Sequence, residues 1–583
     1  MTVAISVGAA GGAMSKRARG QRVRVIFTTS ALPFLCGSVL VLLALVSLII
    51  GPFLDLDDAH KSSVPHMLKS TSLHLSDLRP QPSNSTKAKL RKTNSEAIWE
   101  SKQAPYFYGC SSPKKSFSRK RSEVQSNGYL LIQASGGLNQ QRTGIIDAVV
   151  VARILNATLV VPQLDHRSYW KDSSNFSDIF DEDWFINALA EDVVLVKQLP
   201  AKVNGRVYFM RVPRRCKTEY FISKILPILR KKKAIRLGKF DYRLSNRIDE
   251  DLQKLRCRVN YHALRFTLPL ESMGQRLVER LRQKSDRYIA LHLRFEADML
   301  AFSGCYYGGG EKEIQELGKM RKRWKTLHTR NPDRERRNGR CPLTPEEVGI
   351  MLRALGFRND SHLYVASGDV YGGEDTLASL KQMFPNYHTK ESLALEGELA
   401  PFTGYSSRMA AIDFIVCAAS NVFVTNNNGN MARILAGHRR YFGHKRTIRP
   451  NARKLGALFL ARSNMTWDLF ASKVRKAQRG HMGDPKEMRP GRGQFFENPS
   501  ACICEASNKE ANPIALQEGM LVDQEDFLDH HSSSSSEMDN EEEDVDPDLD
   551  DAVLMQEEDM DQEDGELGVD DEAEIKNVTS IPV

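Results

Sequence analysis

Apolar and polar positions follow two different periods through the central part of the chain. The apolar run Tyr129–Ala134 predicts a buried strand, and Thr158–Pro162 predicts a second one. Between them, apolar residues recur at the spacing of an amphipathic helix, at Ile145, Ile146, Val149, Ala152 and Leu155. Strand, helix and strand in this order predict a βαβ unit, whose two strands run parallel.

The same alternation returns after residue 287. Apolar runs predict strands at 288–295, 362–368 and 421–426, and helical spacing predicts helices at 344–357, 376–384, 407–419 and 430–442. Two α/β domains facing a cleft, 126–285 and 286–480, accommodate this order better than one sheet. A basic insert at 312–340 is expected to form a lid or an exposed excursion.

The pattern near the N-terminus is different, because residues 31–54 contain no charged side chain. At about 1.5 Å per residue, this segment can cross a hydrocarbon core of roughly 30 Å. Basic residues precede it and acidic residues follow it, so we expect residues 1–30 in the cytoplasm and the bulk of the chain in a lumen. This pattern is typical of a single-pass type II signal anchor. A cleaved signal peptide is the alternative, but the apolar run is longer than such peptides use.

Segments without sustained periodicity flank the two domains. Residues 55–125 predict a flexible stem, and 481–583 predict a disordered acidic tail. The stretch Glu537–Glu574 holds 21 acidic residues and no Lys or Arg, so the rest of a chain with net charge +9 carries +30. Lumenal placement argues against nucleic acid as the partner of this basic body. Anionic nucleotide sugars or acidic polysaccharide fit it better.

Sequons and cysteines agree with exposure to a lumen. N-x-[ST] sequons occur at Asn84, Asn156, Asn175, Asn359, Asn464 and Asn577. Of nine cysteines, Cys36 lies in the apolar segment, and the other eight could pair in many ways in an oxidising compartment. We single out Cys305 with Cys341, a pair that would close off the basic insert. Cys502 and Cys504 are interpreted as a local or lumenal thiol pair and not as zinc ligands.

The first strand-to-helix turn reads SGGLNQQR, Ser135–Arg142. Gly136 and Gly137 permit a sharp turn with free amides at a helix start, where negative charge is favoured. An ordinary glycine turn is the alternative. Asn139, Gln140 and Arg142 immediately beyond it add a dense set of hydrogen-bond donors, which favours a ligand site.

A second polar cluster comes at the end of the strand expected at 288–295. There His292, Arg294 and Glu296 would share one face, with Asp298 following. An arginine at a strand end can direct two parallel hydrogen bonds to a phosphate. The alternative is a structural network in which Arg294 pairs with Glu296 or Asp298, and His292 alone is more typical of a core residue.

Two further strand-end loops contribute polar groups. The loop Asn428, Gly429 and Asn430 opens a helix whose amides could hold an anion, and Ser367 and Asp369 could meet a sugar hydroxyl or a base. The sequence shows no metal-binding motif. Four such loops at one cleft predict a diphosphate ligand bound without metal, which in a membrane-anchored lumenal protein indicates a nucleotide-sugar glycosyltransferase.

Five motifs in this order and spacing resemble the plant protein O-fucosyltransferase-like family: GGLNQQR, HLRFEADMLAFSGC, CPLTPEEVG, YVASGDVYGG and NNNGNMARILAGHRRY, within about residues 126–470. The resemblance implies a GT-B-type fold of two Rossmann-like domains, with the acceptor on the N-terminal and the donor on the C-terminal side. It also implies a Golgi location and metal-independent, inverting transfer without a cofactor. The donor would be GDP-fucose and the acceptor a hydroxyl of a glycan, polysaccharide or glycoprotein.

The resemblance also implies roles for individual residues. Arg294 would hold the donor diphosphate, Asn139 would lie near the reacting centre, and Asp298 matches the acidic residue four positions after the arginine. The loop Asn428–Asn430 would lie on the phosphate side. The resemblance identifies no catalytic base. Some plant relatives are rhamnosyltransferases that act on pectin with UDP-rhamnose, so this donor remains an alternative. A non-catalytic lumenal binding protein is another, which the intact Arg294 and glycine-containing loops oppose.

Overall fold

The computed structural model describes residues 97–115, 117, 125–166, 171–203, 207–322, 331–426, 429–487 and 495–506. All of them belong to one compact unit that begins at Ser85. The expected anchor 31–54, the acidic tract and the sequons Asn84 and Asn577 lie outside the described residues. Within the described ranges, no helix has both the length and the apolar character needed to cross a bilayer.

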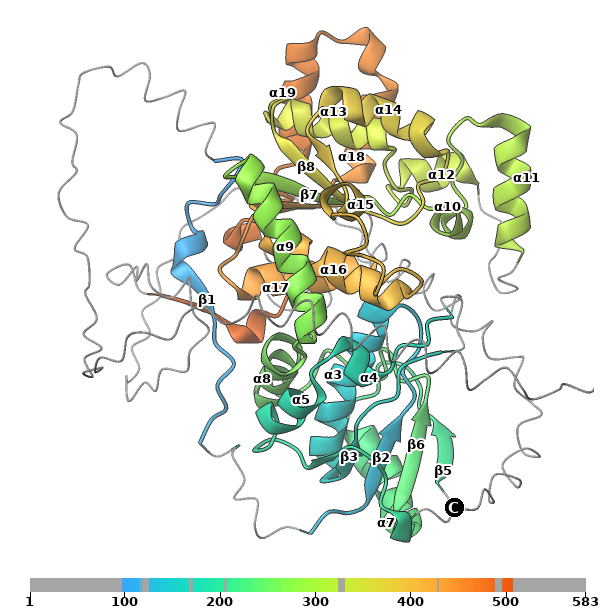
Figure 1. Cartoon of the computed structure of the whole chain (residues 1–583), viewed down its shortest axis with the longest axis vertical. Coiled ribbons are helices and arrows are strands. Elements are labelled where there is room, and N and C mark those ends of the chain that lie inside the picture. The colour runs from blue at the N-terminus through green and yellow to red at the C-terminus, as the bar shows by residue number, and fades with distance from the viewer. Residues whose placement is uncertain are drawn as a thin grey trace, which may run out of the picture. The chain divides into compact units, whose positions relative to one another are not determined.

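Five parallel strands form the N-terminal sheet, in the order β4-β3-β2-β6-β5 (Figure 1). They are β2 (Tyr129–Ile132), β3 (Thr158–Val160), β4 (Leu195–Val196), β5 (Tyr208–Arg211) and β6 (Ala234–Gly238). Helix α3 (Leu138–Leu155) joins β2 to β3. The predicted βαβ unit is therefore confirmed.

The C-terminal sheet is also parallel, in the order β11-β10-β7-β8-β9. Its strands are β7 (Tyr288–His292), β8 (His362–Ala366), β9 (Tyr387–His388), β10 (Val422–Thr425) and β11 (Thr447–Ile448). The four helices expected here are present as α13 (Pro345–Leu355), α14 (Gly373–Met383), α16 (Ser406–Ala419) and α17 (Asn430–Tyr441). The chain is thus an α/β protein with parallel sheets.

Strand β7 ends at His292, three residues earlier than expected. Arg294 has φ +42°, in the left-handed region, so the regular alternation of side chains stops before it. His292, Arg294 and Glu296 therefore do not share one strand face, and that prediction was wrong.

The two faces of β7 belong to different hydrophobic cores. Ile289 and Leu291 pack into a core that includes α13 and α14, whereas Tyr288 and Ala290 join a core that extends from α3 and β2 through α9 (Leu268–Lys284) to α16. This second core is continuous between the two sheets. Apolar packing thus fixes the N-terminal sheet against the C-terminal one, which positions the two carboxyl edges relative to each other.

The expected stem and tail both contribute to the folded unit. Strand β1 (Phe107–Gly109) pairs antiparallel with β12 (Ile503–Glu505), and disulfides join Cys110 to Cys504 and Cys257 to Cys502. The stem limit at 125, the tail limit at 481 and the local pairing of Cys502 with Cys504 were therefore wrong. Cross-links between distant segments stabilise them in a way that local composition does not reveal.

The basic insert begins with α11 (Gly310–Arg321) and ends with α12 (Pro332–Arg337); residues 323–330 lie outside the described ranges. A disulfide joins Cys305 to Cys341 at its base, the pair singled out from the sequence. Arg321 donates hydrogen bonds to the carbonyls of Ala301 and Phe302 (2.7 and 2.5 Å). The first half of the insert is thus attached to the body of the C-terminal half.

Candidate active site

The glycine turn between β2 and α3 is held by side chains on both sides. Gly136 has φ +78° and donates its amide to Asp165 Oδ2 (3.1 Å). The Gln141 side chain donates to the Gly136 carbonyl (2.9 Å) and accepts from the Asp165 amide (2.8 Å). Gly137 is the N-cap of α3. The turn therefore presents the helix start in one fixed conformation.

Asn139 lies in the first turn of α3 and is 6% exposed. Its Oδ1 has no hydrogen-bond partner among the described residues. Burying an unpaired amide oxygen is unfavourable, so a site of this kind favours a ligand that brings a donor such as a hydroxyl.

Arg142, which was expected to add to this donor set, points into the core instead. Its guanidinium lies 4.6 Å from the ring centroid of Phe414 on α16 and also faces Phe180 and Phe266. Burial lowers its pKa to about 10. Arg142 thus joins the two halves of the core and is not available to a ligand at the turn.

Arg294 is held by two carboxylates. Its Nη1 donates to Glu296 Oε2 (2.8 Å) and Asp298 Oδ1 (3.0 Å), and its Nη2 donates to Asp298 Oδ2 (2.9 Å). Asp298 lies in the first turn of α10 (Ala297–Ser303). Burial opposes charge on both partners, but the attraction prevails: it raises the pKa of Arg294 and lowers the pKa of Glu296 to about 2. The guanidinium is therefore charged and oriented at any physiological pH.

The left-handed backbone of Arg294 is fixed by its neighbours. The Leu293 amide donates to the Ala366 carbonyl (3.3 Å), and the Leu293 carbonyl accepts from Asn426 Nδ2 (2.7 Å). On the other side, the Tyr371 amide donates to the Phe295 carbonyl (2.8 Å). Such a conformation is unfavourable by about 1–3 kcal/mol and is typical of functional positions.

A second layer of contacts supports Glu296. Its Oε1 accepts from Ser367 Oγ (3.0 Å) and from the Gly368 amide (2.9 Å). Ser367, expected to meet a ligand, thus orients a carboxylate that holds Arg294. Asp369, two residues further along, is exposed.

Behind Ser367 lies a buried ion pair. Lys390 Nζ donates to the Ser367 carbonyl (3.1 Å) and to Asp413 Oδ2 (3.0 Å), and the Tyr364 hydroxyl donates to Asp413 Oδ1 (2.6 Å). These contacts join β8, α15 (Lys390–Leu393) and α16 behind the loop that carries Arg294. These contacts support the site from behind.

His292 is buried beside this network. Its Nδ1 lies 3.2 Å from the Ala366 carbonyl, which can only accept, so Nδ1 carries the proton and Nε2 is an acceptor. Burial lowers the pKa of His292 to about 4, and the charge of Arg294 contributes in the same direction. His292 is therefore neutral near pH 7.

The loop after β10 connects the two sheet edges. Asn428 lies outside the described residues, whereas Gly429 is the N-cap of α17 and Asn430 is its first residue. The hydroxyl of Tyr242, from the loop after β6, donates to Asn430 Oδ1. The carboxyl edges of the two sheets therefore meet at the start of α17.

Residues of this site that were missed from the sequence include Tyr242, Lys390, Asp413 and Asn426. Asn426 belongs to the polar run that drew attention to the loop, so its neighbours could have indicated it. The others carry no local signal. Lys390 and Asp413 are separated by 23 residues in the sequence, and Tyr242 and Asn430 by 188 residues.

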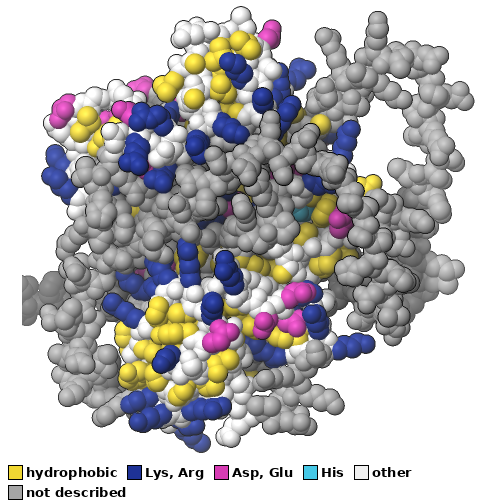
Figure 2. Space-filling view, turned by 180° about the vertical axis from the view of Figure 1, so that it is seen from behind, with side chains coloured by type: hydrophobic (Ala, Val, Ile, Leu, Met, Phe, Trp, Pro, Cys, Tyr) yellow, Lys and Arg dark blue, Asp and Glu magenta, His cyan; other side chains and the backbone are white. Residues whose placement is uncertain are grey.

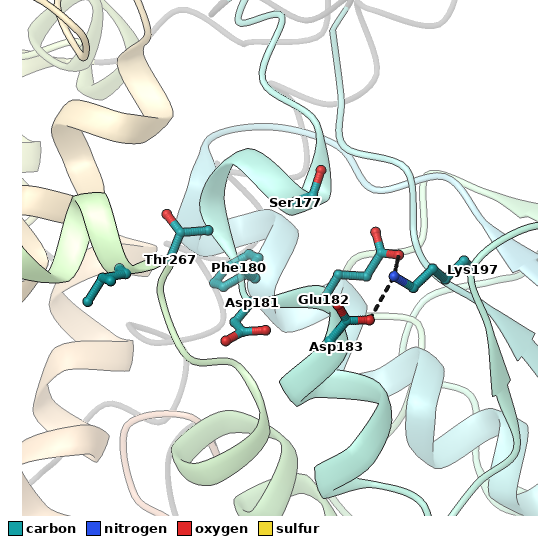
Figure 3. Close-up of a pocket in the computed structure, with 8 residues that line it drawn as sticks. Ser177, Phe180, Asp181, Glu182, Asp183, Lys197 and Thr267 are labelled. Carbon is teal, nitrogen blue, oxygen red and sulfur yellow. Dashed lines mark ion pairs between the residues drawn. The ribbon is translucent and has the colours of Figure 1, made fainter.

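A hollow elsewhere on the N-terminal half contains none of the expected site residues (Figure 3). It has a volume of about 430 Å³. Lys197 at its side pairs with Asp183 (2.7 Å) and Glu182 (3.5 Å). Nowhere in the described ranges does a group of three or more His, Cys, Asp or Glu side chains have the arrangement of a metal site.

Together, the two edges offer an oriented guanidinium, the start of α17 and the buried, unpartnered acceptor atom of Asn139. A guanidinium and helix-start amides suit phosphate oxygens, and an amide oxygen suits a hydroxyl. The arrangement can therefore hold a phosphorylated sugar and stabilise negative charge that develops on the phosphate.

Comparison with known proteins identifies relatives of this chain. The family model described as GDP-fucose protein O-fucosyltransferase matches residues 129–442. O-fucosyltransferase 6 of Arabidopsis thaliana is 52% identical over 556 residues, covering 94% of this chain and 97% of that protein. Rhamnogalacturonan I rhamnosyltransferase 1 of the same plant is 43% identical, covering 66% and 80%. A solved structure of POFUT1 with GDP-fucose aligns at 14% identity and a TM-score of 0.35, covering 55% and 96%.

Proposed function

Since the chain belongs to the GDP-fucose protein O-fucosyltransferase family and is a glycosyltransferase, we propose that it transfers fucose from GDP-fucose to a hydroxyl group of a glycan or protein. The transfer would invert the anomeric carbon and need no metal. The observation that carries this proposal is Arg294, a partly buried guanidinium that two carboxylates and a strained backbone hold just after the end of β7.

In this mechanism the acceptor hydroxyl attacks the anomeric carbon from the face opposite the nucleotide. Negative charge then develops on the departing β-phosphate, where Arg294 and the amides at the start of α17 would stabilise it. Asn139 Oδ1 would accept a hydrogen bond from a hydroxyl of the sugar or of the acceptor. Asp298 would orient Arg294, because both of its oxygens already bind that guanidinium. No described residue is assigned as the base.

A rhamnosyltransferase that uses UDP-rhamnose is the second candidate. It is favoured by one observation, the 43% identity to a plant protein named as a rhamnogalacturonan I rhamnosyltransferase. The phosphate-binding groups would serve both donors, so the two candidates differ in the base and the sugar that they bind.

We also propose a GT-B-like arrangement, with the acceptor on the N-terminal side and the donor on the C-terminal side, in a type II Golgi membrane protein. Three disulfides support an oxidising compartment. The sequons at Asn175, Asn359 and Asn464 are exposed, which suits glycosylation. Asn156 fits less well, because its side-chain amide donates to the Gln125 carbonyl (3.1 Å).

The test is to incubate the purified full-length protein with GDP-fucose or UDP-rhamnose and to follow nucleotide release and labelled sugar transfer. We expect release from GDP-fucose well above release from UDP-rhamnose. The opposite preference would establish the second candidate. Binding of either donor without turnover, across a panel of acceptors, would instead indicate a non-catalytic lumenal binding protein.

A further inference from the structure

Two neighbouring loops at the carboxyl edge of the N-terminal sheet are strongly basic. Residues 211–217 begin at the last residue of β5, and residues 239–247 follow β6; together we call them the basic loops. They contain one acidic residue, the buried Asp241, and seven basic ones: Arg211, Arg214, Arg215, Lys217, Lys239, Arg243 and Arg247. This concentration of cations produces a positive field along one edge.

The basic loops are built as one rigid unit. The Arg215 amide donates to the Tyr242 carbonyl (2.9 Å), and the Cys216 amide donates to the Arg243 carbonyl (2.8 Å). Three of their non-glycine residues have left-handed backbones, Arg215 (φ +55°), Lys239 (φ +44°) and Tyr242 (φ +49°). Strained backbone held in this way is typical of binding and catalytic loops.

The basic loops adjoin the candidate active site. Asp241 accepts hydrogen bonds from Ser135 Oγ (2.9 Å) and Gln140 Nε2 (3.1 Å), which belong to the glycine turn. Tyr242 reaches Asn430 at the start of α17. A molecule bound along these loops would therefore approach the glycine turn from the N-terminal side.

Aromatic side chains extend the surface along β5. Phe209 is 52% exposed, and a Cβ added to Gly238 would lie 2.5 Å from its ring, so the ring covers that glycine closely. Tyr208, the preceding residue, is 42% exposed on the opposite face of the strand. Figure 2 shows lysine and arginine side chains interspersed with hydrophobic ones over this half of the molecule. A flat exposed ring beside cations can stack against the apolar face of a sugar.

We propose that the basic loops and Phe209 bind the acceptor, and that this acceptor is a glycan carrying carboxylates. The cations would attract and orient the carboxylates, and the aromatic ring would contact a sugar face. An acidic peptide would use the cations but would gain little from an exposed ring. This inference rests on the proposed transfer function, because it assigns the other substrate of the same site.

The test measures binding in the absence of donor, using the full-length protein and an oligomer of galacturonic acid. The variant Arg211→Gln/Lys217→Gln removes two exposed charges without touching Asp241. The matched control, Lys473→Gln/Lys476→Gln, removes two exposed charges from α19 (Trp467–Ala477). We expect the first variant to bind about five- to tenfold more weakly and the control to match the native protein. Phe209→Ala should weaken binding of the oligomer further.

Two reference ligands complete the test. The methyl-esterified oligomer keeps the sugars but lacks the charges, and we expect it to bind poorly. Poly-glutamate of similar charge should bind more weakly than the oligomer and should not respond to Phe209→Ala. Equal binding of the ester, equal binding of poly-glutamate, or equal losses in variant and control would each overturn the inference. Donor turnover is measured separately, so the proposed function can survive that result.

Discussion

The carboxyl edges of the two sheets hold their cations in opposite ways. At the C-terminal sheet, Arg294 is partly buried and paired with Glu296 and Asp298, with a further ion pair behind them. At the N-terminal sheet, the basic loops carry seven basic residues and one carboxylate, the buried Asp241, which lies 3.8 Å from Arg214. The C-terminal edge carries one oriented guanidinium, whereas the N-terminal edge carries several basic side chains over a wider surface.

This difference matches the two kinds of substrate that a glycosyltransferase binds. A pyrophosphate is compact, so it is best met by a few oriented groups whose position does not change during reaction. An extended acceptor is better served by a broad field, which also increases the rate of encounter. Variants at the two edges should therefore affect different measured quantities.

The largest effect is expected from Arg294→Ala. Removing a group that stabilises the departing phosphate should reduce kcat about 10²–10³-fold. Buried Asp298 and partly buried Glu296 would be left without their cation, so we also expect a lower melting temperature. Steady-state kinetics and thermal unfolding of the same preparation check both effects.

The control for Arg294→Ala is Arg358→Ala, which breaks an exposed Arg–Asp pair in the same half of the molecule (Arg358 Nη2 to Asp360 Oδ2, 2.8 Å). Its turnover should remain native and its stability should change by no more than about 1 kcal/mol. Near-native turnover of a folded Arg294→Ala protein would show that Arg294 does not stabilise the departing phosphate.

Lys390→Met should have the largest effect on stability alone. It leaves Asp413 buried without its cation, which typically destabilises a protein by about 3–5 kcal/mol. In Lys390→Met/Asp413→Asn the buried charge is also gone, and we expect much of the loss to be recovered. Urea unfolding of the two variants measures this difference. If the two variants unfold alike, the Lys390–Asp413 ion pair does not stabilise the loop that carries Arg294.

Acidification should lower the free energy of unfolding through buried histidines of the C-terminal half. Burial lowers the pKa of His292 and of His444 from the ordinary value of 6.5 to about 4. Unfolding therefore takes up protons below pH 6.5, so the stability that depends on neutral histidine is lost as the pH falls from 6.5 to 4. Glu296, with its pKa near 2, keeps its ion pair through this window. Unfolding free energies across the window should fall less steeply in His292→Asn than in the native protein.

The sequence predicted the architecture well because helical and strand periods are local. Asn139, Arg294 and Asp298 also stood in recognisable runs. Local patterns could not reveal that Arg142 turns into an aromatic cage, that Ser367 supports Glu296, or that Cys502 pairs with Cys257, since each of these depends on residues brought together from distant segments. The early end of β7 escaped prediction for the same reason, because Asn426, which directly follows β10, holds the bend before Arg294.

The smallest effect concerns the contact that joins the two edges. Tyr242→Phe removes the hydroxyl that donates to Asn430 Oδ1 and leaves the ring in place. A hydrogen bond of this kind contributes about 1 kcal/mol, so the melting temperature should fall only slightly. If the start of α17 contacts the donor phosphate, loosening Asn430 should raise the KM for the nucleotide sugar with little change in kcat. Donor binding that is unaltered in a variant with lowered stability would mean that the two edges meet there for structural reasons alone.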